Sequence, residues 1–502
     1  MATLAAYLGI DVGTTNLKGA AFCADTGSLL GTSASRLVVS TAPDGQREQD
    51  LRDLRRGLLE CCRGLLQALP LGTEIKGIGI AAQGGSGAIV DQAGGGPLTP
   101  MLLWNDSRPL PLLPDIAAQM TDAYWRDLSQ RNGPGAGLAK IKWLCHHCGQ
   151  SLEDGQLYVG AGEYTFHQLT GVWRQDPCNA LQMGCYRVLE DRLTETPLQL
   201  VGASLKRIAP LRNGHTTRPL SSTAAAELGL PEGIPVAGPY MDHEAGYMSA
   251  ARISSRPLQC SLGTAWVGNF VLPPGCTGWA PVQLVIPSPA APGRLVVQPL
   301  LTGNVSWDWA LGSLLHSEHA QALELCRATF ERELLPPRGL TCVPWCTQRH
   351  PIVPGLLGGG SFCGLSAHTS RDDLLRGVAA GLAFEFARVF EMPVAKGGID
   401  AIVLGGGASK GTFFQTLFAA LFDQLPLATL ADEDLAGARG TLYPFRPDLA
   451  ASEARPVAPA PPDVCARVQE QYDDYRTVFD RLYGNVESGH KYDISDGKSV
   501  TH

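Results

Sequence analysis

The feature that most constrains the fold is a pattern that occurs twice in the chain. Near the N-terminus, two apolar segments (6–12 and 16–23) are joined by a Gly-Thr-Thr turn. Residues 259–272 repeat this order of apolar segment, Gly-Thr turn and apolar segment. Short apolar runs that flank a glycine turn are typical of β-hairpins. The sequence therefore predicts a chain that starts the same fold twice.

Helical and extended segments alternate after each predicted hairpin. Helices are indicated where apolar residues recur at helical spacing, and strands where apolar runs end in glycine. The expected segments are a helix at 50–68, a strand at 74–84, a strand and helix at 233–251, a helix at 370–391 with Ser370 or Asp372 as its N-cap, a strand, glycine turn and helix at 398–423, and a helix at 469–483. This alternation predicts an α/β protein.

The length of the chain predicts how it is divided. A chain of 502 residues is too long for one hydrophobic core. We therefore expect a first domain of residues 1–250 and a second of residues 251–484. Residues 446–463 are rich in proline and alanine and should form an extended surface segment. Residues 485–502 are polar and should form a disordered tail.

Composition and charge exclude several classes of protein. A net charge of -8 argues against nucleic acid as the main partner, which needs a basic surface. No run approaches the ~20 apolar residues that cross a bilayer, and the N-terminus has no signal-peptide pattern. The 14 cysteines lie mostly in apolar segments, which indicates buried thiols in a reducing cytoplasm. Cys145 and Cys148 enclose two histidines, so a metal site stays open beside the simpler interpretation as a helix end.

Asp11 lies in an unusual place for a carboxylate. It stands inside the first apolar segment, where burying a charge is costly unless a partner compensates it. The backbone N–H groups and hydroxyls of the next turn, Gly13-Thr14-Thr15, suit a phosphate. A cation between the carboxylate and the phosphate would remove their repulsion, so Asp11 is a candidate for organising Mg²⁺ that bridges ATP phosphates. The alternative is a tight turn in which Asp11 caps its own backbone.

Two further glycine turns are candidate nucleotide contacts. The second hairpin turn contains Gly263 and Thr264. Between a later apolar strand and a helix stand Gly405, Gly406, Gly407 and Ala408. Glycines allow close contact with a flat ligand, and a helix N-terminus favours anions. Neither the P-loop spacing nor the usual dinucleotide fingerprint is present, and ordinary packing of a strand on a helix is the alternative.

Asp242 is the candidate general base. It follows an apolar strand and precedes a run of small residues in GPYMDHEAG. A carboxylate at the C-terminal end of a strand, beside a cleft, can accept a proton from a substrate hydroxyl. An aspartate that caps the following helix is the alternative.

In this order, the segments resemble the FGGY carbohydrate kinases, and within them the xylulokinase and ribulokinase group. This family belongs to the actin-like ATPase superfamily, and the resemblance runs from Leu8 to about Tyr483. Its landmarks include GIDVGTTNLK, REQD, GIGIAAQG, LLWNDSRP, AKIKWL, DPCNA, IPVAGPYMD, SLGTA and LGGGASKG. Each motif is modestly specific, whereas their joint order and spacing are highly specific. The resemblance implies two ribonuclease-H-like domains with a deep cleft between them.

The resemblance also implies an activity and a set of contacts. It implies ATP-dependent phosphorylation of a sugar or polyol hydroxyl, most of all in a pentulose or related ketose, with Asp242 as general base and Asp11 at Mg²⁺. The implied nucleotide contacts are Gly13, Thr14, Thr15, Lys18, Gly263, Thr264, Gly405, Gly406, Gly407 and Ala408. The implied acceptor contacts are Gln83, Gly84, Trp104, Asn105, Asp106 and Asp242. Closure of the domains would exclude water, and a homodimer is a further expectation from the family.

Some stretches depart from the family pattern. Where relatives carry larger side chains after Gln83, this chain has Gly84-Gly85, and residues 133–140 have only Gly and Ala where several members place bulky or polar groups. In the second half, a GERTP motif is reduced to TQRHP (347–351). The missing side chains predict a roomier acceptor pocket that takes a bulkier or less hydroxylated compound.

Other functions and roles stay open at this stage. A nucleotide switch on the same fold, such as a chaperone ATPase, would need a peptide-binding domain after Tyr483, where only a short segment follows. A silent sugar-binding relative with a regulatory role fits the altered acceptor residues, whereas Asp242 opposes it. Asp106 either accepts hydrogen bonds from sugar hydroxyls or forms a salt bridge with Arg108.

Overall fold

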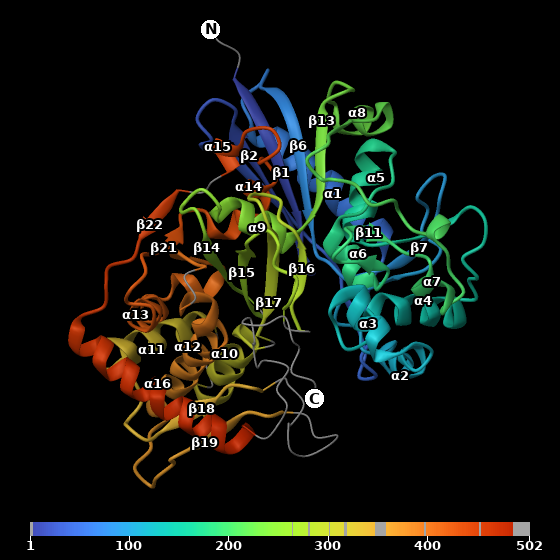
Figure 1. Cartoon of the computed structure of the whole chain (residues 1–502). Coiled ribbons are helices and arrows are strands. Elements are labelled where there is room, and N and C mark those ends of the chain that lie inside the picture. The colour runs from blue at the N-terminus through green and yellow to red at the C-terminus, as the bar shows by residue number, and fades with distance from the viewer. Residues whose placement is uncertain are drawn as a thin grey trace.

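The fold is described from a computed structural model. It covers residues 4–263, 265–279, 282–300, 302–315, 319–346, 358–395, 398–450 and 453–484. Figure 1 shows two large sheets, one formed by the blue and green part of the chain and one by the yellow to red part, each covered by helices. The predicted α/β class is confirmed.

The first sheet has the strand order β12-β13-β6-β1-β2-β3. Its strands are β1 (Ala5–Val12), β2 (Asn16–Cys23), β3 (Leu29–Arg36), β6 (Glu74–Ala82), β12 (Arg218–Pro219) and β13 (Pro235–Met241). Strand β1 is antiparallel to β2 and parallel to β6. Leu8, Ile10 and Val12, which share one face of this central strand, are fully buried.

The second sheet repeats this arrangement. Its order is β16-β17-β15-β14-β20-β21-β22. Its strands are β14 (Pro257–Leu262), β15 (Trp266–Leu272), β16 (Leu284–Pro287), β17 (Arg294–Pro299), β20 (Ala401–Gly405), β21 (Leu427–Leu430) and β22 (Ala454–Pro456). Strand β14 is antiparallel to β15 and parallel to β20, as β1 is to β2 and β6. The prediction of two hairpins that start the same fold twice is confirmed.

Two of the main helices begin at capping residues, whose side chains accept hydrogen bonds from backbone N–H groups of the first turn. The side chain of Asp50 accepts the N–H of Arg52 and starts α1 (Leu51–Ala68), which packs its leucines on the first sheet. In the second half, α12 (Arg371–Ala395) starts after Ser370, whose hydroxyl accepts the N–H of Asp373. Ser370, and not Asp372, is therefore the cap. The other large helices are α5 (Ala161–Thr170), α11 (His319–Arg332), α13 (Thr412–Leu421) and α16 (Pro462–Tyr483).

Smaller elements complete the two halves. On the first half these are β4 (Ser40–Thr41), β5 (Arg47–Gln49), β7 (Ala88–Asp91), β8 (Met101–Leu102), β9 (Gln156–Val159), β10 (Tyr186–Arg187), β11 (Arg192–Leu193), α2 (Leu113–Ala117), α3 (Asp122–Ser129), α4 (Ala136–His147), α6 (Pro177–Met183), α7 (Thr196–Gln199) and α8 (Ser222–Leu228). On the second half they are α10 (Asn304–Ala310), β18 (Thr341–Val343), β19 (Ser361–Cys363) and α15 (Pro447–Ala450).

The C-terminal part differs in detail from the prediction. Residues 446–463 are not extended throughout, because they contain α15 and the edge strand β22. The last helix begins seven residues before the predicted start, since Pro462 fits the first helical position and Asp463 favours the first turn. The predicted tail at 485–502 lies outside the described residues.

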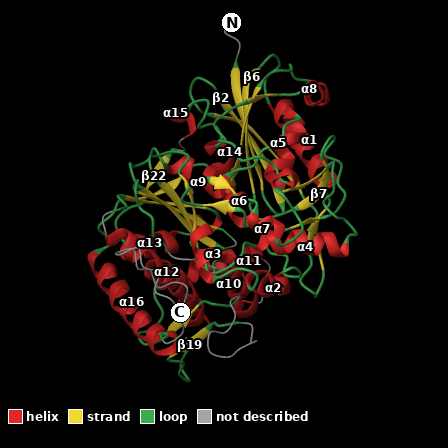
Figure 2. Cartoon of the chain, turned by 45° about the vertical axis from the view of Figure 1, so that its right-hand side comes forward, coloured by secondary structure: helices red, strands yellow, loops and turns green. Residues whose placement is uncertain are grey.

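Two short helices lie between the sheets. Helix α9 (Asp242–Ala250) follows β13, and α14 (Ala436–Gly440) comes from the far end of the chain to pack on α9 and β1. Figure 2 shows both helices where the sheets approach each other. A side chain at Gly9 would collide with the carbonyl of Ala438, and one at Gly440 with the carbonyl of Ala245. Glycine is therefore required for this close contact.

The boundary predicted near residue 250 falls between the sheets, since β13 ends at Met241 and β14 begins at Pro257. None of the helices in the described parts of the chain is long and apolar enough to cross a membrane.

Candidate active site

The carboxyl edge of the first sheet brings the predicted carboxylates together. Val12 on β1 and Met241 on β13 both pair with Ala82 on the strand between them, so these three strands end at one level. Asp11 precedes Val12, and Asp242 follows Met241. Electrostatic repulsion from Asp242 helps to raise the pKa of Asp11, which shows that the two carboxylates lie within electrostatic range.

Asp11 is a carboxylate without a hydrogen-bond or ion-pair partner among the described residues. Its Oδ1 is buried and accepts no hydrogen bond from any residue that the structure describes. Burial, with the repulsion from Asp242 second, raises its pKa to about 7, and the charge of Lys18 on the paired strand opposes this shift. The residue therefore does not cap its own backbone. Gly437 on α14 leaves the space in which the carboxylate stands, because a side chain there would collide with Asp11.

Asp242 is the first residue of α9 and not its cap. The cap position belongs to Met241, whose N–H donates to Glu244 Oε2 at 2.8 Å. Asp242 Oδ1 accepts the N–H of His243 at 2.9 Å, and its Oδ2 has no hydrogen-bond partner among the described residues. Because Glu244 does the capping, the carboxylate of Asp242 remains available at the strand end.

The first hairpin turn is joined to the predicted acceptor residues. Thr14 Oγ1 donates to Gln83 Oε1 at 2.9 Å and accepts from Trp104 Nε1 at 3.2 Å. Gln49 Nε2 donates to the carbonyl of Thr14 at 2.5 Å. The indole of Trp104 is 48% exposed, so it offers a flat apolar face beside the turn. The structure thus brings Thr14, Gln83 and Trp104 together, and Gln49 is a contact that sequence reasoning missed.

The remaining residues of the first turn lie at its rim. Gly13 closes the turn by donating its N–H to the carbonyl of Asn16 at 3.0 Å, and the side chain of Thr15 is exposed. Lys18 reaches the second half of the chain, where its Nζ donates to the carbonyl of Asp434 at 3.3 Å.

Asp106 forms the salt bridge with Arg108 that the sequence offered as an alternative to sugar binding. Its carboxylate is buried and accepts from the backbone N–H and guanidinium of Arg108 and from the backbone N–H of Arg47 at 2.9 Å. Both oxygens are thereby engaged, so Asp106 braces the loop that carries Trp104. Its neighbour Asn105 is exposed.

Lys140 is a second residue that sequence reasoning missed. Its buried Nζ donates to the carbonyls of Gly85 at 2.6 Å and Leu103 at 2.5 Å. Burial lowers its pKa to about 7. Lys140 therefore ties together the loops that follow Gln83 and precede Trp104. The segment AKIKWL is a landmark of the family resemblance, but a lysine inside a helix gives no signal of such a role.

The hypothesis of a roomier acceptor pocket is wrong, because other groups fill the space. The side chain of Gln182 on α6 occupies the place of a side chain at Gly84, where its Nε2 would be 2.5 Å from a Cβ atom, and also that of Gly85. The glycines at 135 and 137 have a packing role, since side chains there would collide with the backbone of α6 and of Gly184.

The glycine turns of the second sheet lie next to each other. Gly406, with φ of 88°, backs directly onto Leu262 at the end of β14. Gly405 ends β20, and the short helical turn that follows includes Gly407 and the buried Ala408. The hydroxyl of Ser409 donates to the carbonyl of Gly406 at 2.7 Å and holds the turn closed.

Asn304 organises the second hairpin turn. Its Nδ2 donates to the carbonyl of Leu262 at 3.3 Å, its Oδ1 accepts from Trp266 Nε1 at 3.1 Å, and its N–H donates to the carbonyl of Gly263 at 3.2 Å. Thr264 lies outside the described residues, as does the altered motif at 347–351. Asn304 lies about forty residues after the turn, so no local pattern in the sequence predicts this contact.

The segment with Cys145 and Cys148 is the end of α4 and the residue after it. His147 stacks on Trp143 with ring centroids 4.3 Å apart. In the parts of the chain that the structure describes, no group of three or more His, Cys, Asp and Glu side chains is placed to hold a metal ion.

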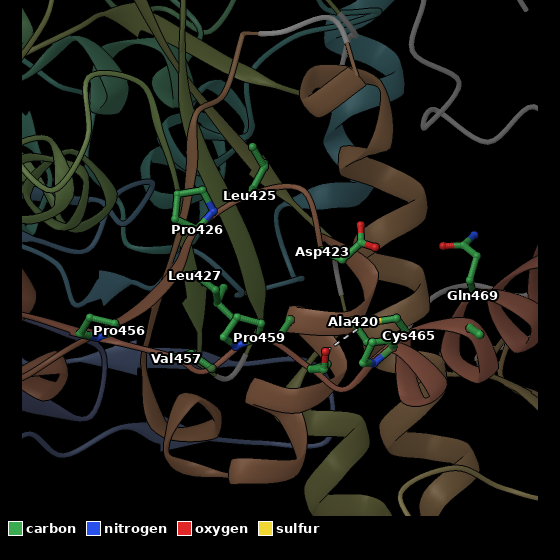
Figure 3. A pocket seen from close by; sticks show the side chains of 14 residues that line it. Ala420, Asp423, Leu425, Pro426, Leu427, Pro456, Val457, Pro459, Cys465 and Gln469 are labelled. Atoms are coloured by element: carbon green, nitrogen blue, oxygen red, sulfur yellow. Dashed lines mark hydrogen bonds between the residues drawn. The ribbon is translucent and has the colours of Figure 1, made fainter.

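A separate cavity of about 690 Å³ lies at the other end of the second sheet (Figure 3). It is lined mainly by apolar and proline side chains of α13, β21 and α16, among them Leu427 at the start of β21. Leu427 pairs with Ile402, near the start of β20, whereas the glycine turn follows the end of that strand. The cavity therefore belongs to the edge opposite the candidate site.

Comparisons with known proteins agree with this geometry. The profile of the FGGY family of carbohydrate kinases, N-terminal domain, matches residues 6–249. The chain is 24% identical to a probable L-xylulose kinase of Pasteurella multocida over 77% of this chain and 79% of that protein. It is also 24% identical to the L-fuculokinase of Escherichia coli K12, over 86% and 90% of the two chains.

Solved structures show the same architecture. The xylulose kinase of Rhodospirillum rubrum superposes with a TM-score of 0.81 at 18% identity, covering 96% of this chain and 99% of that one. The glycerol kinase of Plasmodium falciparum, solved with ADP, superposes with a TM-score of 0.76 at 15% identity, over 96% and 99%. The predicted pair of actin-like domains is confirmed. The profile match thus assigns residues 6–249 to the FGGY family of carbohydrate kinases, and the sequence and structural similarity to carbohydrate kinases extends over most of the rest of the chain.

Proposed function

We propose that this kinase transfers the γ-phosphoryl group of ATP to a hydroxyl of a sugar or polyol, and that a pentulose or related ketose is its acceptor. The observation that carries the proposal is the meeting of Asp11 and Asp242 at the carboxyl edge of the first sheet. Phosphoryl transfer needs a group that receives the proton of the attacking hydroxyl and groups that hold the phosphates and their metal. One carboxylate is available for each task.

Asp242 is the proposed general base. Its Oδ2 has no hydrogen-bond partner in the described parts of the chain, and the fixed N–H of His243 at 2.9 Å orients the carboxylate through Oδ1. The acceptor hydroxyl would donate to Oδ2 and pass its proton there as the oxygen attacks the γ-phosphorus. The bond from the γ-phosphorus to the bridging oxygen of ATP breaks in the same step, and ADP leaves.

Asp11 fits a magnesium ion. Its buried Oδ1 lacks a hydrogen-bond donor, and a carboxylate oxygen is the ligand type that Mg²⁺ prefers. When bound, the ion neutralises part of the phosphate charge. Gly13, Thr14, Thr15 and Lys18 are proposed to surround the transferred group, with the N–H groups of Thr14 and Thr15 as donors, because the N–H of Gly13 already closes the turn.

The second sheet is proposed to bind the rest of the nucleotide. Gly263 and Thr264 would contact the phosphates, and residues 405–408 would line the adenosine pocket. The close approach of Gly406 to Leu262 supports this, because it puts the glycine backbone at 405–407 directly against the backbone that leads into the second hairpin turn. A flat base can approach such a surface closely.

Gln83, Trp104 and Asn105 are proposed to bind the acceptor. An exposed indole face beside a hydrogen-bonding amide suits a sugar, which has apolar C–H faces and polar edges. Similar proteins named as kinases of L-xylulose, xylulose, L-fuculose and erythritol support a small polyhydroxylated acceptor. Asp106 is proposed as a brace for this loop and not as a direct contact.

The proposal is tested by ADP release with Mg-ATP across a panel of ketoses, aldoses and polyols. We expect a strong response to one compound or a small related group. Asp242→Asn should lower kcat for that compound by about 10²–10⁴-fold, while nucleotide binding measured by calorimetry persists.

Asp122→Asn is the matched control, because Asp122 is also the first residue of a helix but is exposed on α3. It should leave kcat unchanged. A silent sugar-binding relative would instead bind sugar and nucleotide without any ADP release that depends on Asp242.

A further inference from the structure

The side chain of Gln182 occupies a central position on the acceptor side of the site. It comes from the end of α6, far in sequence from Gly84 and Gly85, yet it takes the space that side chains at both positions would fill. A Cβ atom on Gly84 would meet Gln182 Nε2 at 2.5 Å, and one on Gly85 would collide with Gln182 Oε1.

The carboxamide of Gln182 lies near two residues of the proposed site region, Met241 and Trp104. The Cβ position of Gly84, next to Nε2, is 3.2 Å from Met241 Cγ, and Met241 directly precedes Asp242. The Cβ position of Gly85, next to Oε1, is 3.5 Å from Trp104 Cβ. The amide group therefore stands at the Gly84-Gly85 loop, near the side chain of Met241 and near Trp104.

This amide has unused hydrogen-bonding capacity. Its Nε2 contacts only sulfur atoms, of Cys178 and Met241, both at 3.8 Å, and sulfur is a weak acceptor. Its Oε1 accepts no hydrogen bond from any residue in the described ranges, and it is not among the polar atoms that are sealed from solvent. One acceptor and at least one donor are thus free to bind a ligand.

The backbone around Gln182 is held firmly. Asp176 caps α6 by accepting the N–H of Asn179 at 2.7 Å. Asn179 Oδ1 in turn accepts the N–H of Gly85 at 3.1 Å. The helix that carries the amide and the glycine loop beneath it are therefore fixed to each other, which is what a specificity contact requires.

We infer that Gln182 determines acceptor specificity by hydrogen-bonding a sugar hydroxyl that neighbours the phosphorylated one. This inference rests on the proposed function. A polar group that loses water on substrate binding and gains no partner disfavours the complex. Gln182 should therefore favour an acceptor with a hydroxyl at this position over an analogue that lacks it.

The test uses the unmodified chain first, with the acceptor panel, and then Gln182→Leu with the preferred sugar and its monodeoxy analogues. Leucine keeps most of the volume and removes the hydrogen bonds. We expect kcat/KM for the preferred sugar to fall about tenfold, mainly through KM. For the deoxy analogue that lacks the hydroxyl bound by Gln182, kcat/KM of the unmodified kinase should be lower than for the preferred sugar by a similar factor. With that analogue, Gln182→Leu should lower kcat/KM little further.

Two controls separate a specificity contact from a space-filling one. Gln119→Leu makes the same change on an exposed residue and should leave kcat/KM unchanged. Gln182→Ala opens the space: if Gln182 only fills it, the alanine variant loses activity while the leucine variant stays within about twofold of the unmodified chain, and the inference is overturned. Nucleotide affinity should be equal in all variants, since the nucleotide residues are elsewhere.

Failure of the proposed function and failure of the role of Gln182 would give different results. If the unmodified chain releases no ADP with any acceptor, the proposed function itself is contradicted. If ADP release depends on one sugar and every deoxy analogue suffers the same loss in Gln182→Leu as in the unmodified chain, only the role of Gln182 is contradicted.

Discussion

The two Gly-Thr turns occupy the same place in their sheets but carry different chemistry. On the first hairpin, Asp11 stands opposite Lys18, so an acid and a base share one face of the sheet. On the second hairpin, the matching position holds Ser261, which stands opposite Val267. The repeated fold has thus kept a turn at the end of the first hairpin strand in both sheets, whereas only the first of these two hairpins carries the charged pair.

The two turns are also held in different ways. Side chains of Gln83 and Trp104 bind the first turn through the hydroxyl of Thr14. The second turn is held by one neutral amide, Asn304. This contrast suggests a division of labour: the first copy positions the reacting groups, and the second offers neutral backbone to the nucleotide.

The largest expected difference is between Asp11→Asn and Ser261→Ala, which change matching positions. Asp11→Asn should lower kcat by about 10²–10³-fold, because a charge that holds the phosphate cation is lost. It should also raise the Mg²⁺ concentration that gives half the maximal rate. Ser261→Ala should change kcat less than about threefold. Steady-state ADP release over a range of Mg²⁺ concentrations measures both, and equal losses in the two variants would remove the asymmetry.

A second expected effect concerns stability and pH. The folded chain keeps a proton on Asp11 up to about its raised pKa of 7, whereas the unfolded chain releases it near 3.8. The folded state therefore binds more protons between these values, and its stability falls as the pH rises through this window. Asparagine cannot ionise. Relative to Asp11→Asn, the unmodified chain should lose roughly 2–3 kcal/mol of unfolding free energy between about pH 5 and pH 8.

This pH effect is measured by urea unfolding without nucleotide or Mg²⁺. The difference between the two proteins is the relevant quantity, since other buried acids such as Glu163 also have raised pKa values and titrate in both. A difference that does not change with pH would mean that Asp11 is charged at no cost in the folded chain.

Local patterns in the sequence were sufficient for the hairpins, the main helices and the two carboxylates. The leucine spacing at 50–68 predicted α1 within one residue at its start, because a helix that buries one face needs that spacing. Asp11 was identifiable because an acidic residue inside an apolar strand is costly without a role.

Contacts between distant segments could not be predicted in the same way. The glycines at 84 and 85 looked like lost side chains, since nothing near them in sequence shows that Gln182 fills their space. Lys140 and Asn304 likewise act on loops far from them in the chain. Periodicity reports which face of an element is buried, but not which distant side chain covers it.

A third prediction sharpens the division of labour between the copies. Asn304→Ala should raise KM for ATP about five- to tenfold and leave KM for the sugar unchanged, because it releases the second turn. Gln83→Ala should raise KM for the sugar and leave KM for ATP unchanged. Initial rates with each substrate varied at saturating levels of the other provide the test, and a variant that raises both KM values equally would show that the turns do not act separately.

The smallest expected effect is at a contact between the two halves. Arg294 on β17 forms a two-point ion pair with Asp191, with Nη1 to Oδ1 at 3.0 Å, and Asp191 is 45% exposed. The side chain of Arg294 is only 16% exposed, but an ion pair with a solvent-exposed partner contributes little, so Arg294→Ala should cost about 0.5 kcal/mol and lower Tm by about 1–2 °C. Because high salt screens such a pair, the Tm difference should shrink in about 1 M NaCl. Arg192→Ala, which breaks a pair with Glu190 inside the first half, is the matched control. If kcat changes for Arg294→Ala but not for Arg192→Ala, the contact between the halves affects closure of the cleft, and the copies are coupled through this ion pair as well as through α9 and α14.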